Sequence, residues 1–156
     1  MIKLAGKGDD LEENKKSMMN NIKNGKAYNK FLELIKNQKG DVTYIENIES
    51  FEKSKFMMPV YSEENGYISK INAKEIGKLA GFLGAGREKK EDKIDPSVGI
   101  ILNKKVGNKV AKDEILAYIH ANDVKKMEET ACKMKEIIKI SKEPIKTNKV
   151  ILGILK

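Results

Sequence analysis

The stretch that decides the fold opens with Gly66-Tyr-Ile-Ser-Lys-Ile-Asn72 and Ala73-Lys-Glu-Ile-Gly-Lys-Leu-Ala-Gly-Phe-Leu83, and it continues through Gly84-Ala-Gly-Arg87. It ends with Val98-Gly-Ile-Ile-Leu-Asn-Lys-Lys-Val-Gly-Asn-Lys-Val-Ala-Lys-Asp-Glu-Ile-Leu-Ala-Tyr-Ile-His-Ala-Asn122. The pattern predicts a strand, a helix, a glycine loop, a second strand and a tight β-ribbon. The expected fold class is α+β.

The helix after Asn72 has the clearest local signals. Asn72 is expected to cap it, and Glu75 completes a pattern like a capping box. Its apolar residues recur at helical spacing and predict one buried stripe: Ile76, Leu79, Ala80 and Leu83. Gly77 and Gly81 are expected to let another backbone approach closely, and Gly84 is expected to end the helix.

On the amino-terminal side, the pattern predicts a helix from Asp9 to Gly25 and a second helix closed by Gly40, which we expect to form an antiparallel hairpin. Residues 41–55 are expected to form a linker with a short turn of structure around Ile45, Ile48 and Phe51. Residues 55–61 should form an edge strand because Pro59 lacks an N–H group. Asn65-Gly66 then predicts a tight hairpin to a return strand over 67–71.

On the carboxyl-terminal side, the ribbon over 106–119 is expected to turn at Gly107-Asn108 and at Lys112-Asp113. Asp123 should cap an amphipathic helix whose stripe comprises Val124, Met127, Ala131, Met134 and Ile138. Pro144 should break the chain, and residues 150–155 should form a terminal strand. The ribbon resembles the hammerhead pattern of biotinyl-type domains.

Composition narrows the possible partners. The chain has 156 residues, a formal net charge of +8, 40% hydrophobic residues and 6% aromatic residues. Its lysines are scattered, Arg87 is its single arginine and tryptophan is absent, so a nucleic-acid surface is not expected. No apolar run is long enough for a membrane span or a signal peptide, so we predict a cytoplasmic protein.

Few residues suggest chemistry. Gly84, Gly86 and Arg87 could hold a phosphate, but a structural helix end is favoured for the glycines, while both roles stay open for Arg87. Glu91, Asp92 and Asp95 are interpreted as solvated loop charges rather than cation ligands. His120 has no partner at metal-ligand spacing, and Cys132 is expected to be a half-buried helical side chain. We therefore predict no catalytic residue, no metal site and no cofactor.

Six segments together resemble the pyrimidine-nucleoside phosphorylases of the thymidine phosphorylase family: Gly66-Tyr-Ile-Ser-Lys-Ile71, the stretch from Ile76-Gly77 through Leu83-Gly-Ala-Gly-Arg87, Lys90-Glu-Asp-Lys-Ile-Asp95, Val98-Gly-Ile-Ile-Leu102, Lys104-Lys-Val-Gly107 and Ile119-His-Ala-Asn122. The lead-in also matches at Leu11-Glu-Glu13, Gly25-Lys-Ala27 and Gln38-Lys-Gly-Asp41, where Lys39 replaces a glycine of the family. The resemblance covers only the carboxyl-terminal third of such enzymes, and their phosphate-binding Lys-x-Ser-Thr-Gly-Gly motif is missing.

The resemblance implies a helical tail of the preceding α/β domain plus linker over 1–55, and a carboxyl-terminal α/β-hammerhead domain over 56–156. It implies phosphate as co-substrate of the complete enzyme, the enzyme's other α and α/β domains as partners, and a homodimer. Gly84, Gly86, Arg87 and Asp92 are then predicted to help close the substrate cleft. The alternatives are a free-standing hammerhead interaction module, or a carrier protein. The carrier is disfavoured because neither Met-Lys-Met nor Asp-Lys-Ala occurs.

Overall fold

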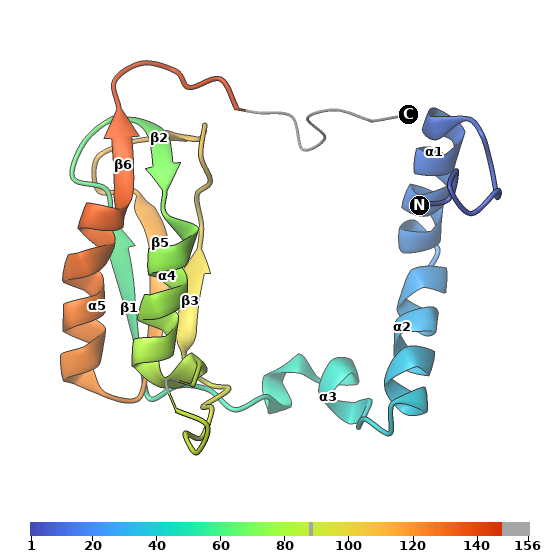
Figure 1. Cartoon of the computed structure of the whole chain (residues 1–156), viewed down its shortest axis with the longest axis horizontal. Coiled ribbons are helices and arrows are strands. Elements are labelled where there is room, and N and C mark those ends of the chain that lie inside the picture. Colours follow the sequence, from blue (N-terminus) through green and yellow to red (C-terminus); the bar gives the residue numbers. More distant parts are fainter. Residues whose placement is uncertain (88, 148–156) are drawn as a thin grey trace. The chain divides into compact units, whose positions relative to one another are not determined.

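The computed structural model describes residues 1–87 and 89–147, which divide into two compact units (Figure 1). Unit 1 comprises Met1–Phe51, and unit 2 begins at Glu52. This division falls shortly before the predicted boundary after residue 55. That unit 1 is the tail of a preceding domain stays a prediction.

Unit 1 is helical throughout. It contains α1 (Leu11–Lys23), α2 (Lys26–Asn37), the single turn α3 (Thr43–Glu46) and a 3₁₀ turn (Ile48–Ser50). Asp10 caps α1 by accepting hydrogen bonds from the backbone N–H groups of Glu12 and Glu13, at 2.8 and 2.9 Å. The short structure predicted around residues 45–51 is confirmed, and the rings of Tyr44 and Phe51 lie 5.4 Å apart there.

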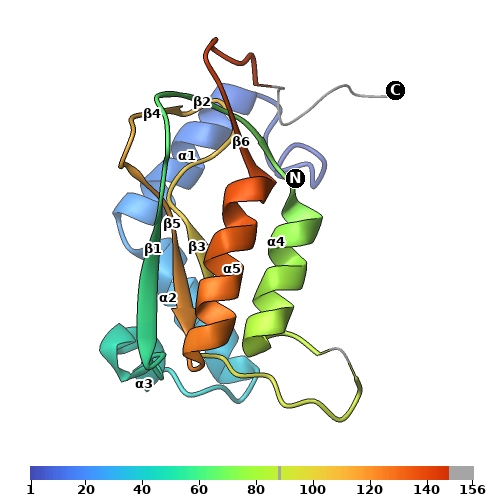
Figure 2. The ribbon, with the colours of Figure 1, turned by 90° about the vertical axis from the view of Figure 1, so that its left-hand side faces the viewer.

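The antiparallel hairpin predicted for the first two helices is wrong. Both views show α2 leading away from the end of α1 rather than folding back beside it (Figures 1 and 2). The physical reason lies at Gly25, which enters α2 at a φ of +79° without forming a reversing loop. Neither helix buries any residue, so the apolar stripes of α1 and α2 stay exposed within unit 1.

Unit 2 is a mixed α+β structure built on two small antiparallel sheets. The first sheet has the order β1-β5-β3, from β1 (Phe56–Tyr61), β5 (Ile115–Ala121) and β3 (Gly99–Leu102). Ile119 is fully buried and pairs with Met58 on one side and Ile100 on the other. The helices α4 (Ala73–Ala80) and α5 (Val124–Ile137) cover one face of this sheet (Figure 2).

The second sheet has the order β4-β2-β6, from β4 (Lys109–Val110), β2 (Gly66–Ile71) and β6 (Ile138–Ser141). The predicted hairpin between residues 55–61 and 67–71 is therefore wrong, because β1 and β2 belong to different sheets. The reason for glycine at position 66 is therefore not a tight turn. A Cβ atom at this position would stand 2.5 Å from the carbonyl oxygen of Ser141, so glycine admits β6 beside β2.

The core lies between the helices and the sheets. It comprises Val60, Ile68, Leu79, Leu83, Val98, Val110, Leu116, Ala117, Ile119, Ala121, Met127, Met134 and Ile138. The predicted stripe of α4 is confirmed at Leu79 and Leu83, and that of α5 at Met127 and Met134. Val124 instead remains 41% exposed, and Thr130 occupies a fully buried place on α5.

Both predicted ribbon turns are confirmed, since Gly107 and Asp113 adopt φ values of +90° and +64°. The strand β6 was missed, because the apolar spacing of α5 runs without interruption into it. The strand expected over 150–155 lies outside the described residues. The close approach expected at Gly77 is wrong, since an added Cβ atom there would meet nothing within 4 Å. At Gly81 another backbone does come close, because a Cβ atom added to Gly86 would stand 3.3 Å from Cα of Gly81.

Candidate functional site

The 84–95 loop follows directly from α4. The helix widens into a π-helical turn (Gly81–Ala85), and Gly84 then leaves helical geometry with a φ of +116°. The carbonyl oxygen of Gly84 accepts a hydrogen bond of 2.9 Å from the N–H of Asp95. The two ends of the loop are thereby held together, as in a compact Ω-loop. The predicted role of Gly84 as the end of the helix is confirmed.

The base of the loop is held by a polar network that reaches two other segments. The Asp95 carboxylate accepts bonds from the N–H and the hydroxyl of Ser97, at 2.9 and 2.6 Å, and from the side-chain amide of Asn122 at 2.7 Å. The same amide donates to the Ser97 hydroxyl at 3.0 Å. The side-chain carbonyl of Asn122 accepts a 2.7 Å bond from the N–H of Lys55.

These hydrogen bonds favour the charged form of Asp95. The Ser97 hydroxyl, the Ser97 N–H and the Asn122 amide, in that order, hold the pKa of Asp95 below its ordinary value, against a weaker opposing effect of burial. Asp95 was predicted to be a solvated loop charge, and it is instead a structural acceptor. No role was predicted for Asn122, although Asn122 ends one of the segments that carry the family resemblance.

Arg87 belongs to a surface hollow beside the loop. The hollow has a volume of about 650 Å³, and its lining includes Gly77, Gly81, Phe82, Gly86, Arg87 and Lys133. Lys126 and Lys133 both lie over the ring of Phe82, with their ammonium nitrogens 5.3 and 5.4 Å from its centroid. The exposed Arg87 side chain borders a surface of mixed charge, because the lining also includes Glu75, which pairs with Lys78 at 2.8 Å, and because Lys133 pairs with Glu129 at 2.6 Å.

Asp92 stabilises a turn within the loop rather than the hollow. Its carboxylate accepts a bond of 2.8 Å from the N–H of Lys89, and its own N–H donates to the Lys89 carbonyl at 3.1 Å. The structure therefore places Gly86 and Arg87 at the hollow, and Gly84 and Asp92 in the hydrogen bonding of the loop.

The other candidates have structural surroundings. His120 is half-buried on β5, with its Nδ1 atom 3.3 Å from the Ser54 hydroxyl. Cys132 is exposed on α5 rather than half-buried as predicted. Within residues 1–87 and 89–147, no group of three or more His, Cys, Asp or Glu side chains could hold a metal ion. In the same residues, no helix is long and apolar enough to cross a membrane.

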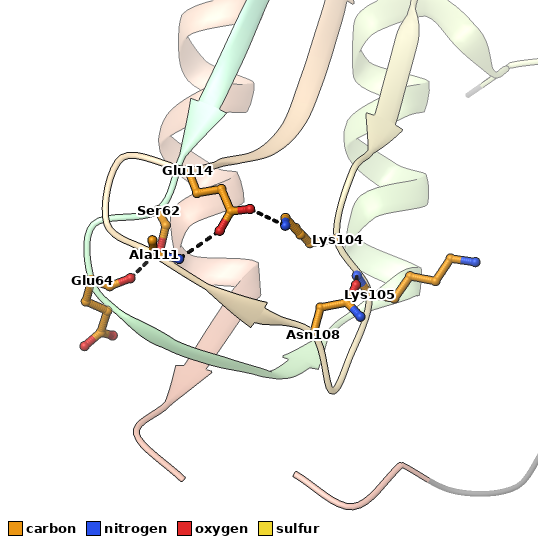
Figure 3. A network of polar contacts seen from close by, with 7 residues as sticks. All are labelled: Ser62, Glu64, Lys104, Lys105, Asn108, Ala111 and Glu114. Atoms are coloured by element: carbon orange, nitrogen blue, oxygen red, sulfur yellow. Dashed lines mark hydrogen bonds and ion pairs between the residues drawn. The ribbon is translucent and has the colours of Figure 1, made fainter. Parts of the chain in front are cut away.

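A second polar network holds the ribbon (Figure 3). The Glu114 carboxylate pairs with Lys104 through one oxygen and accepts the N–H of Ala111 at 2.8 Å through the other. The Lys104 and Ala111 contacts hold the pKa of Glu114 below its ordinary value. The buried hydroxyl of Ser62 donates to the Glu64 carbonyl at 2.7 Å, which shapes the connection between the two sheets. Ser62 also lines a surface cavity of about 630 Å³, whose wall includes Cys132 and Lys135.

Comparison with known proteins shows which family residues 67–141 match. The family model of the pyrimidine nucleoside phosphorylase C-terminal domain matches residues 67–141, which include the 84–95 loop and Asn122. Residues 67–141 belong to this domain family. Over these residues the chain is similar to the C-terminal domain of pyrimidine-nucleoside phosphorylases, as the resemblance in its sequence indicated.

Curated relatives of the family extend the match on both sides. The pyrimidine-nucleoside phosphorylase of Bacillus subtilis is 41% identical over 143 residues, covering 92% of this chain and 33% of the relative. Those of Staphylococcus epidermidis and Staphylococcus aureus are 43% and 41% identical over 122 residues, covering 78% of this chain and 28% of each relative. The chain spans about a third of the length of these relatives.

Proposed function

We propose that this chain supplies the carboxyl-terminal α/β-hammerhead lobe of a pyrimidine-nucleoside phosphorylase, an enzyme that uses phosphate to release the base from thymidine or uridine and forms a pentose 1-phosphate. In this proposal the lobe forms one wall of the substrate cleft, the 84–95 loop helps to close it, and the lobe alone is inactive. Its partners are the remaining α and α/β domains, within a dimeric, cytoplasmic enzyme.

The observation that carries the proposal, beside the family match, is the exposed apolar surface of unit 1. Large apolar side chains on α1 and α2 remain about half exposed, among them Leu11 (66%), Ile22 (64%), Phe31 (46%) and Leu34 (55%). Helices of this kind need another surface to cover their apolar stripes. Within unit 1 these stripes are uncovered, and the chain matches only about a third of the relative's length, which together favour a piece of a longer protein over the alternative, a free-standing interaction module.

Complementation tests the proposal. The purified chain is assayed for phosphate-dependent release of base from uridine and thymidine, alone and after mixing with the Bacillus subtilis relative truncated to remove the matching portion. We expect activity only in the mixture. Activity of the chain alone, or no activity and no complex on mixing as judged by sedimentation, would contradict it.

The role of the loop is tested separately in the active mixture. Arg87→Ala should lower kcat/KM roughly tenfold, which corresponds to about one charge-assisted hydrogen bond, and Arg87→Lys should restore part of it. Lys139→Ala is the control, because it removes a cation from β6 in the other sheet of unit 2. Unchanged turnover and substrate affinity in Arg87→Ala would remove the loop from the proposal.

A further inference from the structure

We propose that Asn122 is a positioning residue that couples the 84–95 loop to the 52–55 segment, through which the chain enters unit 2. The coupling itself is independent of the proposed function. That it governs cleft closure rests on the proposed function.

The geometry gives this amide three partners from two directions. Its carbonyl oxygen faces the N–H of Lys55 at 2.7 Å, and its NH₂ group faces Asp95 and Ser97 at 2.7 and 3.0 Å. The reversed orientation would set the NH₂ group against an N–H and the oxygen against a carboxylate, so the partners fix the direction of the side chain. All three partners, Lys55, Asp95 and Ser97, are distant from Asn122 in the sequence.

The place of Asn122 in the fold makes this contact consequential. It lies between the end of β5 and Asp123, whose side chain caps α5 by accepting from the N–H of Lys126 at 3.1 Å. Its neighbour in sequence, Ala121, is 1% exposed and pairs with Phe56 on β1. The backbone of Asn122 is therefore fixed by the core, while its two partner segments are a surface loop and the connection from unit 1.

A second contact joins the same two elements. The Ser54 hydroxyl lies 3.3 Å from Nδ1 of His120 and donates to the carbonyl of Phe56 at 3.0 Å. The 52–55 segment is thus held at His120 on β5 and at Asn122, just after the end of β5. The 84–95 loop is held to the end of β5 through Asn122, whose NH₂ group donates to the Asp95 carboxylate and to the Ser97 hydroxyl. If Lys55 moves away, the Asn122 amide loses one contact that fixes its direction, so its hydrogen bond to Asp95 should weaken.

In a longer phosphorylase, the 52–55 segment is where any movement of the preceding domain reaches this lobe. Displacement of Lys55 would release the carbonyl of the Asn122 amide, and the loop base would lose its fixed donor. The loop carrying Arg87 would then be ordered only when the segment is seated. We therefore infer that the position of the 52–55 segment controls how well ordered the 84–95 loop is.

Amide hydrogen exchange on the whole chain tests the coupling. Asp95→Ala should raise exchange at the N–H of Lys55 about fivefold, equivalent to one hydrogen bond, although Asp95 does not contact Lys55. The matched control is Asp92→Ala, which removes a carboxylate from the same loop that bonds Lys89 rather than Asn122. It should leave Lys55 unchanged.

A swap of the two polar groups provides the rescue. Asn122→Asp keeps an acceptor for Lys55 but places two carboxylates together, so exchange should rise at Ser97 and tryptic cleavage in the 84–95 loop should quicken. Adding Asp95→Asn restores a donor opposite the new carboxylate, and both readouts should return toward the original chain. Amides of α5 serve as the internal standard for folding.

The exchange and proteolysis results either support the coupling or overturn it. Rescue by the double variant together with the Lys55 response supports the coupling. Loss of protection at Ser97 without any change at Lys55 in Asp95→Ala, or an equal change in Asp92→Ala, would overturn it, as would failure of the swap to rescue. None of these readouts depends on phosphorylase activity, so a failed complementation assay would leave this result intact.

Discussion

Gly66 lies so close to the carbonyl group of Ser141 that a methyl group at position 66 would stand 2.5 Å from its oxygen and 2.6 Å from Cγ2 of Ile140. Ser141 pairs with Tyr67, the residue after Gly66, where β2 meets β6. The backbone of β6 cannot move without disturbing Ile138, which is buried in the core. Glycine at position 66 therefore leaves room for β6 beside β2.

Gly66→Ala should therefore destabilise unit 2 by about 1–3 kcal/mol, as expected for overpacking against backbone. Gly77→Ala is the matched control, because its new methyl group would meet nothing within 4 Å and alanine favours a helix by ~1 kcal/mol. Urea unfolding followed by circular dichroism measures both. Equal effects of the two substitutions would contradict the role of the β2–β6 approach.

Lys39→Gly should stabilise the end of α2 by about 1 kcal/mol. Lys39 has a φ of +60°, and the N–H groups of Lys39 and Gly40 bond the carbonyls of Lys36 and Ile35, both at 2.9 Å, in a Schellman motif. This is the position where the chain departs from the family's glycine. Exchange of the last amides of α2 should slow in Lys39→Gly, whereas Lys36→Gly should quicken it.

Thr130→Val should raise stability by about 1 kcal/mol. Thr130 is fully buried, and among the described residues its hydroxyl has no hydrogen-bond partner. Valine keeps the shape and removes the unpaired group. Thr130→Ser, which keeps the hydroxyl and removes the methyl group, should lower stability by a similar amount. A lower melting temperature of Thr130→Val would show that the hydroxyl has a partner in solution.

The stability of unit 2 should fall in acid because of Asp95. Its pKa is lowered in the folded chain from an ordinary value of 3.8, so the folded state binds the proton less readily than the unfolded state. The contribution is complete above that ordinary value and is lost as the pH falls through the lower folded pKa. Urea titrations between about pH 6 and pH 2.5 should show a shallower slope for Asp95→Asn than for the original chain.

Glu114→Ala should destabilise the ribbon more than Glu129→Ala. Glu114 pairs with the half-buried Lys104 and accepts the N–H of Ala111, whereas Glu129 makes an exposed pair with Lys133 along α5. Glu114→Gln should recover part of the loss, because the amide oxygen can still accept from Ala111. Melting temperatures measured at low and high salt distinguish the two pairs. An equal loss of stability in Glu129→Ala and Glu114→Ala would contradict the prediction.

Much of the fold is local and could be predicted from the sequence. The caps at Asp10, Asn72 and Asp123, the buried faces of α4 and α5, and the turns at Gly107 and Asp113 depend on neighbours a few residues away. The family resemblance came from the same residues. The placement of Gly84 at the end of α4 followed from its freedom to adopt positive φ.

Strand pairing was beyond the sequence, because it depends on partners far along the chain. Asn65-Gly66 has the signature of a hairpin, yet Gly66 is glycine because β6 passes beside it, and Ser141 lies 75 residues away in a strand that the helical spacing concealed. The helices α1 and α2 were predicted correctly, but nothing in their periodicity states whether they pack together.

The candidate site likewise has local features that could be predicted and long-range contacts that could not. Composition and helix-ending signals are local properties, so the amino-acid pattern alone predicts a glycine-rich polar loop with one arginine after α4. The role of Asp95 as a structural acceptor and the contact of Asn122 with Lys55 become visible only in the folded chain. A side-chain amide acquires such a role when folding brings its donors and acceptors within 3 Å of segments that are remote in sequence.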